Sequence, residues 1–213
     1  MTRYRAMRIP IKQPAPTDWL STKELAKIFE YVCDKADKSR ARGKKISWEI
    51  TNEMLVLLLA ETGIRAKEAT NLRLENLPCC HGHNEIKVTY GKNRYSRSIG
   101  ISEFLTEKIN AYAGRVCQPG DFFLKNELGK PLTYEPLKAR IRHIGLAAKV
   151  RIYRSDGQLR TLLTLAHFRR SYLRLMDEVK LERPKARTGT FSKWLKTLYD
   201  RRQDIKSQLT KAE

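Results

Sequence analysis

A strongly apolar stretch near the start of the chain places the tightest constraint on its fold. Residues 54–60 read Met-Leu-Val-Leu-Leu-Leu-Ala, inside a helix predicted over residues 48–61 and stopped by Thr62 and Gly63. The run is far shorter than the roughly 20 apolar residues that cross a bilayer. With 213 residues, 41% of them hydrophobic, the chain can bury such a helix in the core of one globular domain.

The rest of the pattern predicts a mainly α-helical protein with a small antiparallel β-sheet. Ser21 with Glu24 three residues later has the spacing of a capping box and starts the first helix. Residues 1–16 are basic, contain three prolines and lack an apolar signal segment, so we expect an arm or linker and no secretion. Further helices are expected over residues 66–77, 102–112, 134–149, 164–179 and 192–201, strands over 85–90, 95–101 and 121–124, and an irregular polar stretch over 151–161.

The charge of the chain indicates a polyanionic partner. Lys and Arg number 43 against 23 Asp and Glu, a net charge of +20. Residues 138–202 hold 18 Lys and Arg against 5 Asp and Glu, so this segment alone contributes +13. One-signed enrichment favours a groove that follows a phosphate backbone and releases counterions, with a merely soluble basic surface as the alternative. The four cysteines do not form a disulfide framework in a chain of this length and are expected to be reduced thiols in a cytosolic protein.

Two short motifs carry residues suited to phosphate chemistry. In Thr62-Gly63-Ile64-Arg65, the glycine permits a tight turn and the arginine is displayed at the start of the next helix, where anions are favoured. Glu68 follows on the same face and can orient a basic neighbour; an ordinary hinge with a surface arginine is the alternative. His167 and Arg170 are three residues apart on a predicted helix, so they share a face and could bind one phosphate.

The order of these motifs resembles the catalytic domain of tyrosine recombinases, the phage integrase family. Arg65 matches the first arginine of the family, Lys92 the lysine of its β-hairpin turn, and His167 with Arg170 its His-x-x-Arg pair. Family members then carry Gly-His or Gly-Trp, with the nucleophilic tyrosine nine residues after the second member. Here Gly189-Thr190 precedes Tyr199 by that spacing, so Thr190 stands where the family has His or Trp.

The resemblance implies the fold, activity and partners of that family over residues 17–202. It implies a DNA breaking–rejoining fold, in which Tyr199 attacks double-stranded DNA to form a 3′-phosphotyrosine and Lys92 protonates the leaving 5′-oxygen. Arginines replace metal in this chemistry, so no metal, ATP or other cofactor is expected. A recombinase would self-associate on DNA as a synaptic tetramer, act in the cytoplasm at the nucleoid of a prokaryote or mobile element, and need no membrane. Residues 203–213 are expected to form a tail able to pack on a neighbouring protomer.

Several alternatives remain open from the sequence. Thr190 and the short segment between Arg170 and Gly189 favour a DNA-binding protein that has lost catalysis; a type IB topoisomerase-like nicking and closing activity would use the same residues. No core-binding domain is evident, so we expect either an isolated catalytic domain or a reduced natural member of the family. Tyr199 lies in a helical apolar stripe and could be a core aromatic. Residues 79–83, Cys-Cys-His-Gly-His, lack zinc-ligand spacing and are expected to be a loop. The DNA-contacting residues are expected to be Arg94, Arg97, Lys138, Arg140, Arg142 and Arg169.

Overall fold

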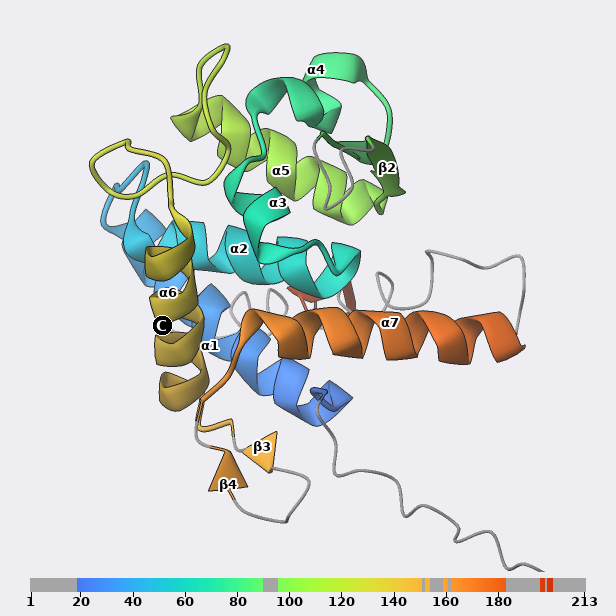
Figure 1. Ribbon diagram of the computed structural model, residues 1–213. Helices are drawn as coiled ribbons and strands as arrows, with labels where there is room; N and C mark the ends of the chain where they lie inside the picture. Colours follow the sequence, from blue (N-terminus) through green and yellow to red (C-terminus); the bar gives the residue numbers. More distant parts are fainter. Residues whose placement is uncertain are drawn as a thin grey trace, which may run out of the picture.

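A computed structural model describes residues 19–89, 96–150, 152–153, 159–160, 162–182, 196–197 and 199–200. Helix α2, Trp48–Thr62, lies at the centre and packs against α1 (Thr22–Ala41), α5 (Glu103–Val116) and α7 (Leu165–Glu182) (Figure 1). Every residue of α2 from Ile50 to Thr62 is buried. The apolar run therefore forms the central helix of a core, and the fold is mainly helical as predicted.

The ends of α2 are set by the residues on either side of it. Ser47 caps the start, its hydroxyl accepting a hydrogen bond from the Ile50 N–H at 3.2 Å. Gly63 ends the helix in the left-handed conformation at φ 55°, and its N–H reaches the Leu59 carbonyl. Gly63 thus ends the helix one residue later than predicted, because Thr62 is its last residue.

The N-terminal end of the described chain is attached to α7. The expected capping box is present, with the Ser21 N–H bonded to Glu24 at 2.7 Å at the start of α1. Just before it, the Leu20 N–H donates to the Ser171 hydroxyl at 2.6 Å, and this bond is buried. The Arg174 guanidinium lies 3.8 Å from the centre of the Trp19 ring. Both Ser171 and Arg174 belong to α7, so this helix holds the start of the domain.

A two-stranded antiparallel sheet forms beside the helices. Strand β1, Glu85–Val88, pairs with β2, Arg97–Gly100, and Val88 lies opposite Arg97. This hairpin was predicted; residues 90–95, which include Lys92 and Arg94, lie outside the described part of the chain. A second pair, β3 (Ile152–Tyr153) and β4 (Leu159–Arg160), lies near α6 (Tyr134–Ala147) in a region expected to be irregular.

Two stretches differ from their predictions because the chain turns more often than the sequence pattern indicated. Residues 66–77, predicted as one helix, form α3 (Ala66–Thr70) and a single 3₁₀ turn, η1 (Leu74–Asn76). The Asn76 side chain accepts the Arg73 N–H at 3.0 Å, which holds the break between them. A further short helix, α4 (Pro78–His81), replaces the loop expected over residues 79–83.

The strand predicted over residues 121–124 is likewise absent as a regular element. Phe122 makes an isolated bridge to Arg73, and Lys125 makes another to Pro131. The apolar Phe123 and Leu124 are buried there without a strand partner to extend the ladder. The hydrophobicity of Phe123 and Leu124 therefore reflects their burial and does not indicate a strand.

None of the helices in the described residues is long and apolar enough to cross a membrane.

Candidate active site

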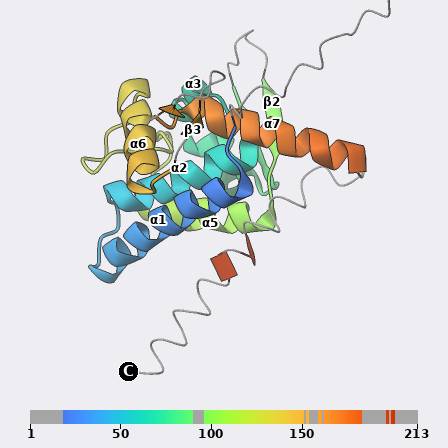
Figure 2. The ribbon, with the colours of Figure 1, turned by 90° about the horizontal axis from the view of Figure 1, so that it is seen from below.

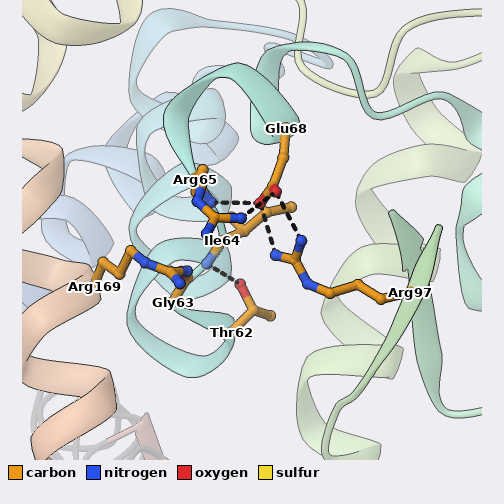
Figure 3. A network of polar contacts seen from close by, with 7 residues as sticks. All are labelled: Thr62, Gly63, Ile64, Arg65, Glu68, Arg97 and Arg169. Atoms are coloured by element: carbon orange, nitrogen blue, oxygen red, sulfur yellow. Dashed lines mark hydrogen bonds and ion pairs between the residues drawn. The ribbon is translucent and has the colours of Figure 1, made fainter. Parts of the chain in front are cut away.

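A buried carboxylate gathers arginines from two separate elements. The Glu68 side chain, on α3, is 3% exposed. Its Oε1 accepts from Arg65 Nη1 at 3.0 Å and from Arg97 Nη1 at 2.7 Å; its Oε2 accepts from the Arg65 backbone N–H at 2.9 Å and from Arg97 Nη2 at 2.7 Å (Figure 3). The expected pairing of Glu68 with a basic neighbour is therefore present, with two arginines.

The Glu68 carboxylate is held in its charged form. Burial by itself would raise the pKa of this carboxyl group, but hydrogen bonds from the Arg97 guanidinium and from Arg65 lower it to about 2. The same hydrogen bonds raise the pKa of Arg97. Glu68 is therefore an anion at every pH near neutrality, and it fixes the arginines around it.

A third arginine reaches this cluster from α7. Arg169 Nη1 donates to the Gly63 carbonyl at 2.5 Å, and Figure 3 shows its guanidinium beside Arg65. Burial lowers the pKa of Arg169, and the nearby positive charges of Arg65 and Arg97 lower it further. Three guanidinium charges against one carboxylate leave the cluster formally at +2, which is a site suited to an anion.

The turn that carries Arg65 is packed against α7. A Cβ atom placed on Gly63 would lie 2.3 Å from Tyr172 Cδ1, so the tyrosine ring fills the space beside this glycine. The Thr62 hydroxyl donates to the Leu58 carbonyl at 2.6 Å and accepts the Ile64 N–H at 3.2 Å. These contacts position the Gly63 carbonyl that receives Arg169.

His167 and Arg170 are placed differently from Arg169. His167 is buried, at 1% exposure. Its Nδ1 lies 3.0 Å from both the backbone nitrogen and the hydroxyl oxygen of Thr164. It accepts the Thr164 N–H and so closes the first turn of α7. Arg170, three residues after His167 on α7, is exposed. Arg169, the residue before it, donates to the Gly63 carbonyl.

Tyr199 lies away from the arginine cluster. It is half-buried, with its ring centre 5.5 Å from that of Phe104 and 3.5 Å from Lys108 Nζ, both on α5. Its ring lines a cavity of about 220 Å³ together with Arg40 and Glu53, which form an ion pair with each other. In Figure 2 the short red segment around residue 199 lies beside α5, on the side of the molecule opposite α7. Thr190 lies outside the described residues.

The predicted DNA-contacting residues on α6 divide into two kinds. Arg142 is exposed, and Lys138 is near the surface, 3.4 Å from Glu135. Arg140, expected on the exposed face, is instead 2% exposed, and its guanidinium carbon lies 4.0 Å from the centre of the Trp48 ring. Burial lowers its pKa. The exposed placement of Arg140 was wrong because this residue shares the inward face of the helix.

No cluster of three His, Cys, Asp or Glu side chains suited to a metal occurs within the described ranges. The four cysteines are all free thiols. Burial raises the pKa of Cys79, next to Cys80, to about 11.

Comparison with known proteins decides the family. The model of the phage integrase family matches residues 18–173, nearly three quarters of the chain. The chain belongs to the phage integrase family. The match includes Arg65, Glu68, Arg97 and Arg169 and ends before Tyr199. Comparison with curated proteins gives no match.

Solved structures show that this integrase-family chain has the recombinase fold. XerA recombinase is similar at a TM-score of 0.56 and 17% identity, over 83% of this chain and 54% of that one. XerH site-specific recombinase bound to its difH substrate in a pre-cleavage complex gives 0.55 and 20%, over 90% and 53%. A lambda integrase (75–356) dimer bound to a COC′ core site gives 0.53 and 14%, over 84% and 56%. The chain spans about half the length of these proteins.

Proposed function

We propose that this chain is a site-specific DNA recombinase that cleaves and rejoins duplex DNA through a phosphotyrosine. The observation that carries the proposal is the convergence of Arg65 and Arg169, from separate elements, beside one buried carboxylate. Guanidinium groups bind phosphate oxygens in pairs and stabilise the extra charge of a five-coordinate phosphorus. Membership of the phage integrase family and the likeness to recombinases bound to DNA support duplex DNA as the substrate.

The reaction assigns a role to each group. The tyrosine oxygen bonds to phosphorus and its proton passes to water; the bond from phosphorus to the 5′-oxygen breaks, and that oxygen receives a proton. Lys92 is the proposed donor of this proton, as in the family resemblance, and Tyr199 the proposed nucleophile. A 5′-hydroxyl that attacks the phosphotyrosine reverses the step, so the reaction consumes no ATP. The proposed mechanism also uses no metal.

Arg169 takes the place of Arg170 as the second phosphate-binding arginine in this proposal. Arg169 is the residue that contacts the Gly63 carbonyl and lies beside Arg65. Ala166, three residues before it, is exposed, whereas His167 is buried against Thr164. The position that would share a helix face with Arg169 therefore carries no imidazole, and His167 acts in capping α7.

Tyr199 must move before it can attack a phosphate held by Arg65 and Arg169. Its ring packs on α5, across the molecule from α7 (Figure 2). This placement, and the end of the family match at residue 173, favour a second candidate: a DNA-binding member of the family without catalysis. Synaptic self-association and a nucleoid location belong to the first candidate.

A nicked suicide substrate separates the two candidates. An active recombinase becomes covalently joined to the DNA, because the short strand beyond the nick diffuses away and religation fails. Tyr199→Phe should fold and bind DNA but form no adduct, and Arg169→Gln should lose far more adduct than Arg170→Gln. An adduct that persists in Tyr199→Phe assigns the nucleophile to another residue; wild type that binds but never forms an adduct supports the second candidate. Relaxation of supercoiled DNA without synapsis would indicate topoisomerase-like activity.

A further inference from the structure

Arg65 and Arg97 each donate two of the four hydrogen bonds at Glu68, but they use different groups to do so. Arg97, the first residue of β2, directs both terminal nitrogens at the two carboxylate oxygens, each at 2.7 Å. This two-pronged pair is the strongest arrangement between arginine and a carboxylate. Arg65 gives its backbone N–H and only one guanidinium nitrogen, Nη1. Arg97 is therefore the principal counter-charge of Glu68.

The two arginines differ in what they leave for a ligand. The side chain of Arg65 is 44% exposed, and its guanidinium contacts Glu68 through Nη1 alone. Both terminal nitrogens of Arg97 are committed to Glu68, and its side chain is 35% exposed. Without Arg97, Arg65 alone would have to balance the buried Glu68 carboxylate, and its positive charge would then be less available to a phosphate.

Arg97 also joins two elements. Its backbone pairs with Val88 of β1, which is buried, so the β-ladder fixes where the side chain starts. Its guanidinium ends on Glu68 of α3, whose carboxylate holds the backbone N–H of Arg65. The hairpin and the start of α3 are thereby held in one geometry.

We infer that Arg97 is a positioning residue: it neutralises Glu68 and fixes β2 to α3, so that Arg65 keeps its charge and direction for the phosphate. This inference rests on the proposed function. It departs from the expectation that Arg97 contacts DNA, because both of its terminal nitrogens are directed at Glu68.

The test compares Arg97→Gln with Lys87→Gln, which removes the same charge from an exposed position on the neighbouring strand. Single-turnover cleavage of bound suicide substrate should fall by about 100-fold in Arg97→Gln, as for a displaced catalytic group, and stay near wild type in Lys87→Gln. Arg97→Lys, which keeps the charge but lacks the fork, should lie between. DNA affinity and its salt slope should be unchanged in Arg97→Gln. A salt slope reduced by about one, with normal cleavage of bound DNA, would make Arg97 a direct phosphate contact and overturn the inference.

A second measurement is independent of cleavage. Carboxyl NMR titration should show the pKa of Glu68 rising from about 2 in Arg97→Gln and unchanged in Lys87→Gln. If wild type forms no adduct, the proposed function fails, yet this titration still tests Arg97. An unchanged Glu68 titration in Arg97→Gln would show that Arg97 does not neutralise the carboxylate, and the inference would be wrong.

Discussion

Replacing Gly63 with alanine should destabilise the protein through two separate effects. Gly63 has φ 55°, a left-handed conformation that costs a residue with a Cβ about 1–2 kcal/mol. The new Cβ would also lie 2.3 Å from Tyr172 Cδ1 and 2.8 Å from Cγ, and both are ring atoms next to the backbone. Forcing extra volume into such packing costs about 1–3 kcal/mol. We therefore expect Gly63→Ala to lower the free energy of unfolding by about 2–5 kcal/mol.

Gly43 supplies the matched control for the backbone effect. It also has a left-handed conformation, at φ 73°, but nothing lies within 4 Å of an added Cβ. Gly43→Ala should therefore cost only the backbone term, about 1–2 kcal/mol. Urea denaturation of both variants isolates the steric part, and Gly63→Ala combined with Tyr172→Ala should lose less than the sum of the single changes. Equal losses for Gly43→Ala and Gly63→Ala would refute the steric argument, and additive losses would show that Tyr172 is not the obstacle.

Four further outcomes are expected. Arg142→Glu should weaken DNA binding and reduce its salt dependence, whereas Arg140→Glu should unfold the protein, as seen by denaturation, because Arg140 is buried against Trp48. Because folding lowers the pKa of Glu68 from 4.5 to about 2, ionised Glu68 stabilises the folded state above pH 4.5, and this stabilisation is lost as the pH falls toward 2. It amounts to about 3 kcal/mol in the free energy of unfolding, measured by comparing the pH dependence of wild type with that of Glu68→Gln. Adduct formation should survive excess EDTA, and complete loss would contradict the tyrosine mechanism. Ala166→His should raise the rate of adduct formation, with no change if this helix face lies away from the phosphate.

The central helix could be predicted because its signals are local. The apolar run and the Thr62–Gly63 stop lie within one stretch, and burial of α2 follows from its composition. The arginine at the start of α3 and its partner Glu68 were also accessible, because three-residue spacing on a helix brings them together. The ion pair between Glu68 and Arg97 could not be predicted from the sequence, because it depends on how the hairpin packs against α3.

Helix phase explains why the sequence prediction misplaced Arg140. Leu137, Ile141 and Ile144 are all buried, and residue 140 lies three after the first and four before the last, so the spacing already placed Arg140 inward. On α7, buried residues flank both arginines, Phe168 before Arg169 and Ser171 after Arg170, so helix phase alone does not choose between them.

The attachment of Trp19 and Leu20 to α7 has a consequence for protein engineering. The Leu20 N–H bonds to Ser171 and the Trp19 ring stacks under Arg174, within two turns of Arg169 on the same helix. A shortened version that begins after residue 20 removes the donor and the ring together and leaves the Ser171 hydroxyl to find another partner. Tags and protease sites should therefore be placed before Trp19, where they leave the contacts of Trp19 and Leu20 with α7 in place.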